Sequence, residues 1–269
     1  MQARSNRLST LRVPGAELYY DERGQGIPIL WLQGLGADHS AWGPQLARFS
    51  SRFQCLAPDN RGAGRTAPGG PISLRVMAED AAALLAARAG DQPAHVVGLS
   101  MGASIALELA RLAPERVRSL VLVSASATIE PRLRELMLAW RAIYPRVPPD
   151  VFQRQANLWL FSWRFFERPN AAAAVIRYAE RSAAPAEWFT AQLDAAISHD
   201  TAAGLPELRI PSLVITGEED IMVPPRMGQA LADLLPDARF VVIPQAGHSV
   251  NLEQQAPFHQ AIARFLDEH

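Results

Sequence analysis

Ser100 is the middle residue of the sequence Gly-Leu-Ser-Met-Gly at positions 98–102, which fits the pattern G-x-S-x-G. The motif lies between an apolar stretch that predicts a strand, residues 94–98, and a stretch that predicts a helix, residues 100–112. A tight strand-to-helix turn with glycine on both sides exposes the serine hydroxyl, and the following helix points its free N-terminal amides at the reacting centre. The spacing therefore predicts a nucleophilic serine at position 100.

A serine hydroxyl becomes an effective nucleophile only when a base accepts its proton. Of the six histidines, His248 fits this role because it follows the last predicted strand and would lie at the same sheet edge as Ser100. His95 falls inside a predicted strand and is expected in the core, whereas His39 follows a glycine-rich loop. The remaining three histidines lie in helical or terminal segments, where exposure to solvent is expected: His199, His259 and His269.

Three adjacent carboxylates, Glu218, Glu219 and Asp220, follow a predicted strand at residues 212–216. A carboxylate at this edge could hold the imidazole in one tautomer and stabilise its cationic form. The residues alone leave the choice among the three open. The chain order serine, acid, histidine belongs to one hydrolase architecture and differs from two other familiar triad orders.

The elements that must position these residues alternate between strands and helices. The predicted strands are nearly continuous apolar runs, which is typical of parallel strands covered on both faces. The pattern therefore predicts an α/β fold with a mostly parallel sheet. The predicted strands are residues 18–20, 27–32, 53–57, 94–98, 119–124, 212–216 and 239–243, and the predicted helices are residues 41–49, 73–89, 100–112, 225–235 and 257–266.

The alternation stops near residue 127. From residue 130 to about residue 203 the chain shows helical segments broken by prolines, with most of its aromatic side chains. The simplest organisation is one α/β domain that carries a helical insertion. Most of these aromatic residues are expected to form a small core of the insertion, and Trp159 and Trp163 are taken as candidate substrate-binding residues.

Composition excludes several classes of protein. The 269 residues are 49% hydrophobic and carry a net charge of −1, so there is no basic surplus for nucleic acid or an anionic membrane. All 26 basic residues are arginine, which excludes Schiff-base chemistry and a phosphate-loop lysine. A single cysteine, Cys55, excludes an intramolecular disulfide and metal sites built on thiolate pairs. No cofactor and no metal are expected.

The chain from Leu18 to Leu266 resembles the α/β-hydrolase fold family, in its serine-nucleophile branch. The likeness is greatest to small hydrolases such as 3-oxoadipate enol-lactonases, cofactor-free haloperoxidases and carboxylesterases. It implies a mostly parallel eight-stranded sheet flanked by helices, with a core domain at residues 1–127 and 206–269 and a helical cap, residues 128–205, inserted after the sixth strand. Five features carry it: residues 33–36, residues 59–64, residues 98–102, Asp220 with Val223 and Pro224, and Gly247 with His248.

The resemblance also implies roles for individual residues. Asp220 is the acid of the triad, the backbone amides of Leu35 and Met101 form the oxyanion hole, and Gln33 and Gly34 belong to the substrate-binding loop. This loop usually begins His-Gly in the family, whereas here it begins Gln33-Gly34. Glutamine can orient the loop by hydrogen bonds but cannot titrate, so any proton-transfer role of that histidine is lost.

The leading hypothesis is a serine hydrolase that cleaves a small carboxylic ester or lactone through an acyl-enzyme. Alternatives are C–C bond hydrolysis, perhydrolysis of the haloperoxidase kind, or acyl transfer on the same triad, and a ligand-binding protein with slow turnover. The N-terminal residues lack a signal-peptide pattern and no apolar run approaches ~18 residues, so a cytoplasmic protein that does not bind membranes is expected. Association into homo-oligomers is left open.

Overall fold

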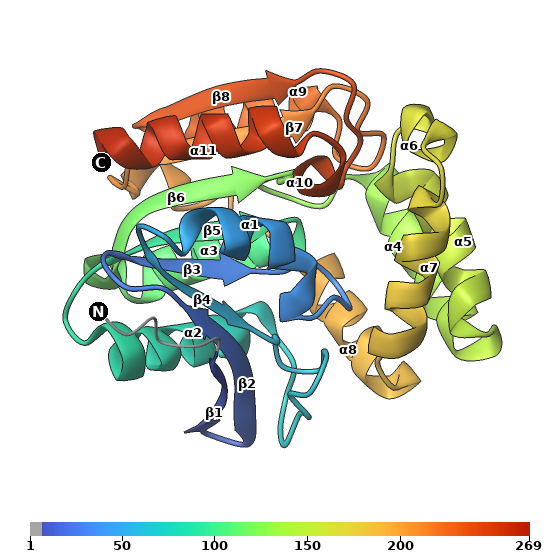
Figure 1. The fold of residues 1–269 in the computed structure, drawn as a ribbon, viewed down its shortest axis with the longest axis horizontal. Coiled ribbons are helices and arrows are strands. Elements are labelled where there is room, and N and C mark those ends of the chain that lie inside the picture. Colours follow the sequence, from blue (N-terminus) through green and yellow to red (C-terminus); the bar gives the residue numbers. More distant parts are fainter. Residues whose placement is uncertain (1–6) are drawn as a thin grey trace.

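The computed structural model describes residues 7–269 and contains an eight-stranded sheet (Figure 1). Strands β1, β2 and β4 pair antiparallel, and all the other pairs are parallel, which confirms the predicted mostly parallel sheet. The residues on which the expectation about targeting depends, 1–6, lie outside the described residues. In sheet order the strands are β1 (Arg7–Val13), β2 (Ala16–Arg23), β4 (Gln54–Pro58), β3 (Pro28–Leu32), β5 (Ala94–Leu99), β6 (Val117–Val123), β7 (Ser212–Gly217) and β8 (Ala238–Ile243).

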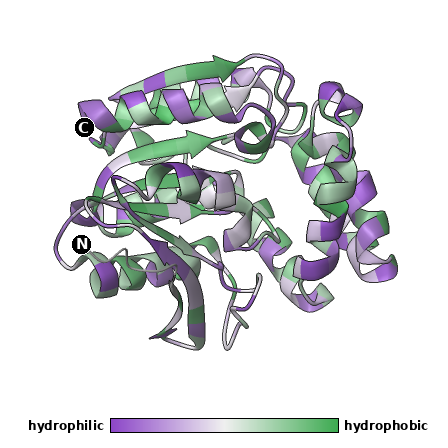
Figure 2. Cartoon of the chain, viewed as in Figure 1, coloured by the Kyte–Doolittle hydropathy of each residue, from purple (hydrophilic) through white to green (hydrophobic). Residues whose placement is uncertain are grey.

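Helices cover both faces of the sheet because the central strands are apolar on both sides. In β3, Leu30 and Leu32 join one core cluster, whereas Ile29 and Trp31 join the other. The first cluster packs under α2 (Leu74–Ala89), α3 (Met101–Leu112) and α9 (Pro225–Leu234), and the second under α1 (Gly43–Phe49) and α11 (Gln255–Glu268). Figure 2 shows hydrophobic colouring along the central strand β6 and mixed colouring along the helices. The sheet is thus a two-sided core that holds its strand ends in place.

Two elements differ from the sequence prediction. β1 was not expected, because it is an edge strand without clean alternation, and its Leu8 is 51% exposed. It forms a hairpin with β2 through a turn in which Gly15 has a φ of 72°. The short helix α10 (Val250–Glu253) directly after His248 was also not expected.

Five α-helices lie between β6 and β7, and we call residues 131–197 the helical insertion. Figure 1 shows it across the edge of the sheet toward which the parallel strands point. Prolines begin two of these helices, at Pro131 and Pro149, where the missing amide hydrogen is not needed. None of the helices within residues 7–269 is long and apolar enough to cross a bilayer. The five helices are α4 (Pro131–Ile143), α5 (Pro149–Leu160), α6 (Trp163–Glu167), α7 (Ala171–Ser182) and α8 (Ala186–Ile197).

Candidate active site

Ser100 occupies a strained turn between β5 and α3. Its φ of 54° and ψ of −118° lie in a region that residues other than glycine rarely adopt. Close packing excludes side chains at the flanking glycines: a Cβ on Gly98 would lie 2.3 Å from the carbonyl oxygen of Gly102, and a Cβ on Gly102 would lie 2.1 Å from that of Leu32. Helix α3 begins at the residue after Ser100. The turn therefore presents the serine at the carboxyl end of β5.

His248 and Asp220 form a buried pair. Nδ1 of His248 lies 2.9 Å from Oδ2 of Asp220, and each residue is 2% exposed. Asp220 follows β7 and His248 follows β8, so two adjacent parallel strands bring the two loops together. The second carboxylate oxygen, Oδ1, accepts the backbone amides of Met222 at 2.9 Å and Val223 at 2.8 Å. These contacts fix the carboxylate and orient the imidazole.

The two neighbouring carboxylates have other partners. Glu219 pairs with Nε of Arg164 at 3.2 Å, and Glu218 accepts the backbone amide of Gln245 at 3.1 Å. Of the three acidic residues, Asp220 alone hydrogen-bonds to His248 within the described chain. The geometry thus separates three carboxylates that the sequence alone could not.

The loop that follows β3 is held by its own glutamine. Oε1 of Gln33 accepts the amide of Gly34 at 2.8 Å, and the Gln33 carbonyl accepts Nδ2 of Asn60 at 2.8 Å. The glutamine thus orients the loop by hydrogen bonds. In the part of the chain that is described, the backbone amides of Leu35 and Met101 have no acceptor. Both are available to an anionic oxygen on a ligand.

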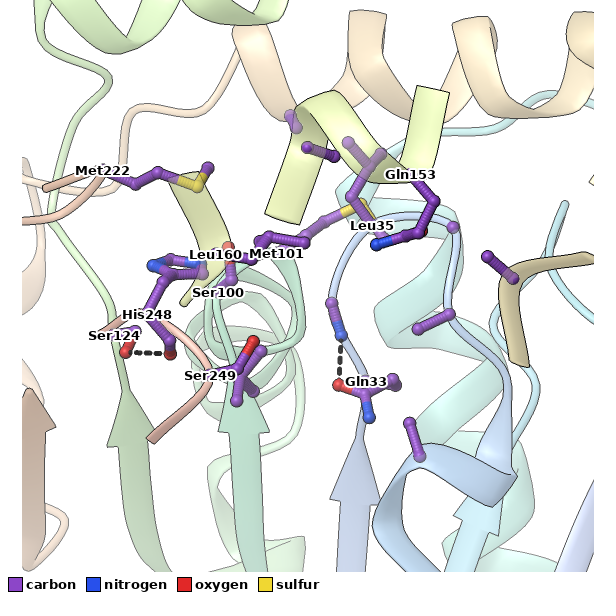
Figure 3. A pocket seen from close by; sticks show the side chains of 18 of the residues that line it. Gln33, Leu35, Ser100, Met101, Ser124, Gln153, Leu160, Met222, His248 and Ser249 are labelled. Atoms are coloured by element: carbon purple, nitrogen blue, oxygen red, sulfur yellow. Dashed lines mark hydrogen bonds between the residues drawn. The ribbon is translucent and has the colours of Figure 1, made fainter. Parts of the chain in front are cut away.

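One cavity of about 380 Å³ connects these groups. Ser100 and His248 line it together with the Gln33–Gly34 loop, and Figure 3 shows the imidazole beside Ser100. No hydrogen bond joins Ser100 to His248 among the residues drawn there. The contact between the serine hydroxyl and the imidazole is therefore not made in this structure. The volume is within the range of pockets for small molecules. Its aromatic lining residues are Trp140, Tyr144, Phe152, Phe161, Tyr178 and Phe189.

Trp159 and Trp163 do not line this cavity, which corrects the expectation that they contact substrate. The face of α5 that meets the cavity carries Phe152. Trp159 instead packs against Arg132, whose guanidinium carbon lies 5.3 Å from the centroid of the tryptophan ring. Trp163 is the first residue of α6 and is 57% exposed. The periodicity of a helix shows which residues share a face but not which face meets a cavity.

Comparison with known proteins places this arrangement in a family. The model of the α/β hydrolase fold matches residues 27–255. The chain belongs to the α/β-hydrolase family. It is 31% identical over 256 residues to the protein named carbamate hydrolase RutD of Azorhizobium caulinodans, covering 94% of this chain and 96% of that protein.

Solved structures agree with this assignment. The enol-lactonase from Burkholderia xenovorans LB400 superposes with a TM-score of 0.88 at 27% identity, covering 96% of this chain and 100% of that one. A thermophilic esterase from Thermogutta terrifontis superposes with a TM-score of 0.85 at 28% identity and covers 97% of each chain. The chain is therefore an enzyme of the α/β-hydrolase family, as the sequence motifs indicate.

The hydrolase fixes its His248 loop through contacts with the rest of the fold. Oγ of Ser124, at the end of β6, donates to the carbonyl of His248 at 2.8 Å. The amide of Ser249 donates to the carbonyl of Leu160 in the helical insertion at 2.9 Å. The loop is therefore bound both to the sheet and to the insertion.

Glu253 strengthens this second link. One oxygen, Oε1, accepts the amide of Gly247 at 2.8 Å, and the other accepts Oγ of Ser162 at 2.6 Å. Glu253 is only 4% exposed, and burial raises the pKa of its carboxyl group. Position 253 lies outside the elements that the sequence predicts, and no local signal distinguishes this residue.

Gln192 of α8 plays a matching part on the other side of the site. Its Oε1 accepts the amide of Gly36 at 2.8 Å, and its Nε2 donates to the carbonyl of Arg61 at 2.8 Å. From α7, the hydroxyl of Tyr178 accepts the amide of Asp38 at 3.0 Å. The helical insertion of the hydrolase thus holds the loop that carries Leu35. Sequence reasoning missed these three contacts, because each joins residues more than a hundred positions apart.

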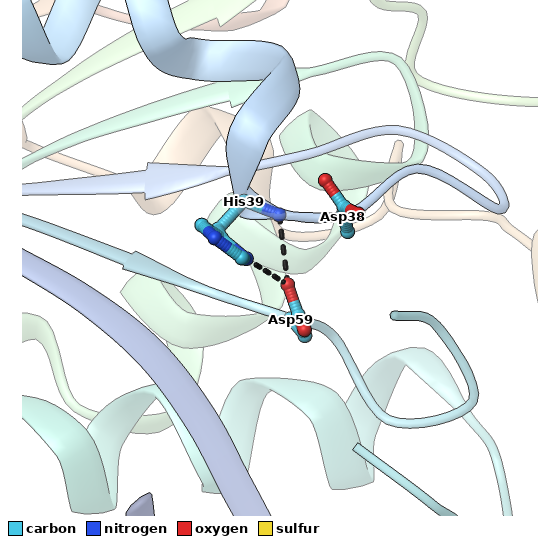
Figure 4. A group of neighbouring side chains, drawn as sticks. All are labelled: Asp38, His39 and Asp59. Carbon is cyan, nitrogen blue, oxygen red and sulfur yellow. Dashed lines mark hydrogen bonds and ion pairs between the residues drawn. The ribbon is translucent and has the colours of Figure 1, made fainter. Parts of the chain in front are cut away.

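A second histidine–carboxylate pair lies outside the cavity (Figure 4). Nδ1 of His39 is 2.7 Å from Oδ1 of Asp59, which also accepts the His39 amide, while Oδ2 accepts the amide of Arg65. With Asp38 these residues form a three-ligand cluster whose ligand atoms lie within 4.8 Å of one another. Both carboxylate oxygens of Asp59 already accept hydrogen bonds from the protein. These bonds join the loop of Asp59 and Arg65 to the segment that carries His39.

The other histidines differ in how well they were predicted. His95 is fully buried, as expected, and donates to or accepts from Oγ of Ser119 at 2.7 Å; burial lowers its pKa to about 4. His199 was expected in solvent, but it is 5% exposed and lines the cavity. Its Nε2 lies 3.1 Å from the carbonyl oxygen of Ser126, so this contact joins the segment after α8 to the segment after β6.

Proposed function

We propose that this hydrolase cleaves small carboxylic esters or lactones through a triad of Ser100, His248 and Asp220. The observation that carries the proposal is the 2.9 Å contact between Nδ1 of His248 and Asp220. It commits one imidazole nitrogen to the acid and leaves the other, Nε2, for the serine beside it. Relatives named esterase and enol-lactonase support the choice of bond.

In the first half of the reaction, Oγ of Ser100 attacks the substrate carbonyl carbon and its proton passes to Nε2 of His248. The carbonyl oxygen becomes an oxyanion that accepts the amides of Leu35 and Met101. Asp220 stabilises the imidazolium through Nδ1. When the tetrahedral intermediate collapses, the bond to the leaving oxygen breaks and that oxygen takes the proton from Nε2, which leaves an acyl-enzyme.

In the second half, water replaces the alcohol. His248 accepts a proton from the water as its oxygen attacks the acyl carbon, and the same two amides bind the second oxyanion. Collapse then breaks the bond to Oγ, returns the proton to Ser100 and releases the carboxylic acid. A lactone follows the same course, except that its leaving oxygen stays attached to the acid.

The helical insertion acts in this proposal as a cap on the core domain. It supplies the cavity wall opposite Ser100 and holds the loops of Leu35 and His248 through Gln192 and Ser162. Water enclosed by such a wall is limited, which strengthens the electrostatic contacts of the triad.

The test is active-site labelling combined with turnover. A fluorophosphonate should label the purified protein at one site per chain, identified by mass spectrometry as Ser100, and p-nitrophenyl esters and small lactones should be hydrolysed. Ser104→Ala, one helical turn further along α3 and also on the cavity wall, is the matched control and should keep labelling at Ser100. Lack of labelling together with lack of turnover on every ester and lactone would overturn the proposal.

A further inference from the structure

The walls of the cavity carry no permanently charged side chain apart from the catalytic pair behind Ser100. None of the lining residues found within residues 7–269 is Arg, Asp or Glu, and the chain contains no Lys. The ionisable groups that reach the cavity are two histidines and two tyrosines: His199, His248, Tyr144 and Tyr178.

The titratable wall groups other than His248 are held neutral. Burial raises the pKa values of Tyr144 and Tyr178, so neither phenol ionises near neutral pH. Burial also lowers the pKa of His199, an effect that outweighs its contact with the carbonyl of Ser126. The wall that faces a bound substrate is therefore uncharged.

Two arginines close to the insertion and its loops, neither of which lines the cavity, are already paired. Arg61 contacts Asp80 at 2.7 Å, and Arg141 contacts Asp194 at 2.6 Å. The charge that lies directly behind the site is the negative one of Asp220, 2.9 Å from the imidazole. A carboxylate on the substrate would thus lose its water, find no cation and be repelled by Asp220.

The remaining wall is suited to hydrocarbon. Helix α4 contributes Leu133, Met137 and Trp140, and α5 and α7 contribute Phe152 and Val175. An uncharged acyl chain placed against these side chains is stabilised by the apolar surface that it removes from water.

We propose, on the basis of the function proposed above, that this enzyme acts on neutral esters or lactones with an apolar acyl group and discriminates against substrates that carry a carboxylate. The specificity-determining feature is the uncharged wall formed by α4, α5 and α7. The wall discriminates between neutral and anionic substrates because it offers a bound carboxylate no cationic partner. A buried, unpaired charge costs far more free energy than the loss of one methylene contact.

The test compares substrates that differ by one charge. kcat/KM is measured at neutral pH for p-nitrophenyl hydrogen adipate, its methyl ester and p-nitrophenyl heptanoate, after subtraction of the enzyme-free rates. The two neutral esters should exceed the anion by at least about tenfold, because the anion alone must be buried without a counterion. The reacting carbonyl and leaving group are the same in all three, so the ratio reports the acyl pocket.

A charge variant sharpens the comparison. Gln153 of α5 lines the cavity and is half-buried, so Gln153→Arg places a guanidinium there, and Gln153→Met is the neutral control. Gln153→Arg should raise kcat/KM for the anion relative to its methyl ester, whereas Gln153→Met should leave that ratio as in the wild type.

The outcomes separate this inference from the proposed function. A wild-type ratio below about tenfold in an enzyme that hydrolyses all three esters would overturn the inference alone. A protein that neither hydrolyses any of them nor labels with fluorophosphonate would overturn the proposed function and the inference together. The wild-type ratio decides the matter even if Gln153→Arg fails to fold.

Discussion

Two histidine–aspartate pairs of nearly equal geometry occur among residues 7–269 of this hydrolase, and only one of them lies beside Ser100. Nδ1 of His248 is 2.9 Å from Asp220, and Nδ1 of His39 is 2.7 Å from Asp59. The first pair lines the cavity with Ser100 through its imidazole, and the second packs beside the ring of Tyr19, 5.4 Å between centroids, outside the cavity.

The difference teaches that the contact between the two side chains is not what makes a pair catalytic. Asp220 holds its own loop with its second oxygen, Oδ1. It binds only Nδ1 of His248, so Nε2 of that imidazole is not used by the pair. Asp59 uses both oxygens to join the His39 and Arg65 loops. We therefore expect the first pair to determine turnover and the second to determine stability.

The largest effect is expected at the nucleophile. Ser100→Ala should fold normally and lose about 10⁴-fold or more in kcat, because neither histidine–aspartate pair can form an acyl-enzyme by itself. The measurement is hydrolysis of the best p-nitrophenyl ester, with the melting temperature as the check on folding. Wild-type turnover in this variant would show that Ser100 is not the nucleophile and would overturn the acyl-enzyme mechanism.

Matched changes in the two acids should then separate the pairs. Asp220→Asn should reduce kcat by about 10³–10⁴-fold, because the amide favours the wrong imidazole tautomer. Asp59→Asn should instead lower the free energy of unfolding by about 1–3 kcal/mol, because one of the three donors to Asp59 loses its acceptor. Urea unfolding and steady-state kinetics on both variants provide the comparison. Equal losses of turnover would contradict it.

The stability of the second pair should also depend on pH. Burial acts to lower the pKa of His39, but the hydrogen bond to Asp59 and its negative charge outweigh this and raise the pKa above the ordinary value. A raised pKa means that the folded state holds the proton more tightly than the unfolded state. The stabilisation is therefore complete below about pH 6.5 and is lost as the pH rises through the folded-state pKa.

The check is the melting temperature of wild type and His39→Gln across this range. The wild-type advantage should shrink as the pH increases above neutrality. An advantage that grows with pH would mean that Asp59 does not stabilise the charged imidazole.

The smallest effects are expected at the neighbours of Asp220. Glu218→Gln and Glu219→Gln should each change kcat/KM by less than about threefold, since partly exposed ion pairs and loop contacts are worth about 0–1 kcal/mol. Both variants are assayed beside Asp220→Asn. A crippling loss in Glu219→Gln together with near-wild-type turnover in Asp220→Asn would show that the wrong carboxylate had been assigned.

The sequence predicts the fold well where apolar runs are long and covered on both faces. Strands β3, β5, β6 and β7 have this character, and all four were predicted. β1 was missed because it is an edge strand whose apolar residues are not all buried. Its Leu8 is exposed to solvent, so the strand shows no clear alternation of apolar and polar residues. The strand-to-helix position of Ser100 could also be predicted, because two glycines and a tight turn are local properties.

What could not be predicted depends on how distant elements meet. The aromatic content of the insertion made Trp159 a candidate, but it could not show that Phe152, rather than Trp159, meets the cavity. Gln192 and Glu253 are ordinary polar residues of helices in the sequence. Their importance comes from hydrogen bonds with backbone amides that form only when the insertion packs on the core. No local sequence pattern predicts such long-range contacts.

The hydrogen bonds of Gln192 and Ser162 bear on how this enzyme could be re-engineered. An insertion exchanged for that of another hydrolase, in order to change substrate range, would remove the acceptor for the Gly36 amide and the donor to Glu253 at the same time. A productive graft must therefore bring a glutamine and a serine to these two places. The insertion can be transplanted between hydrolases only if these two side chains travel with it.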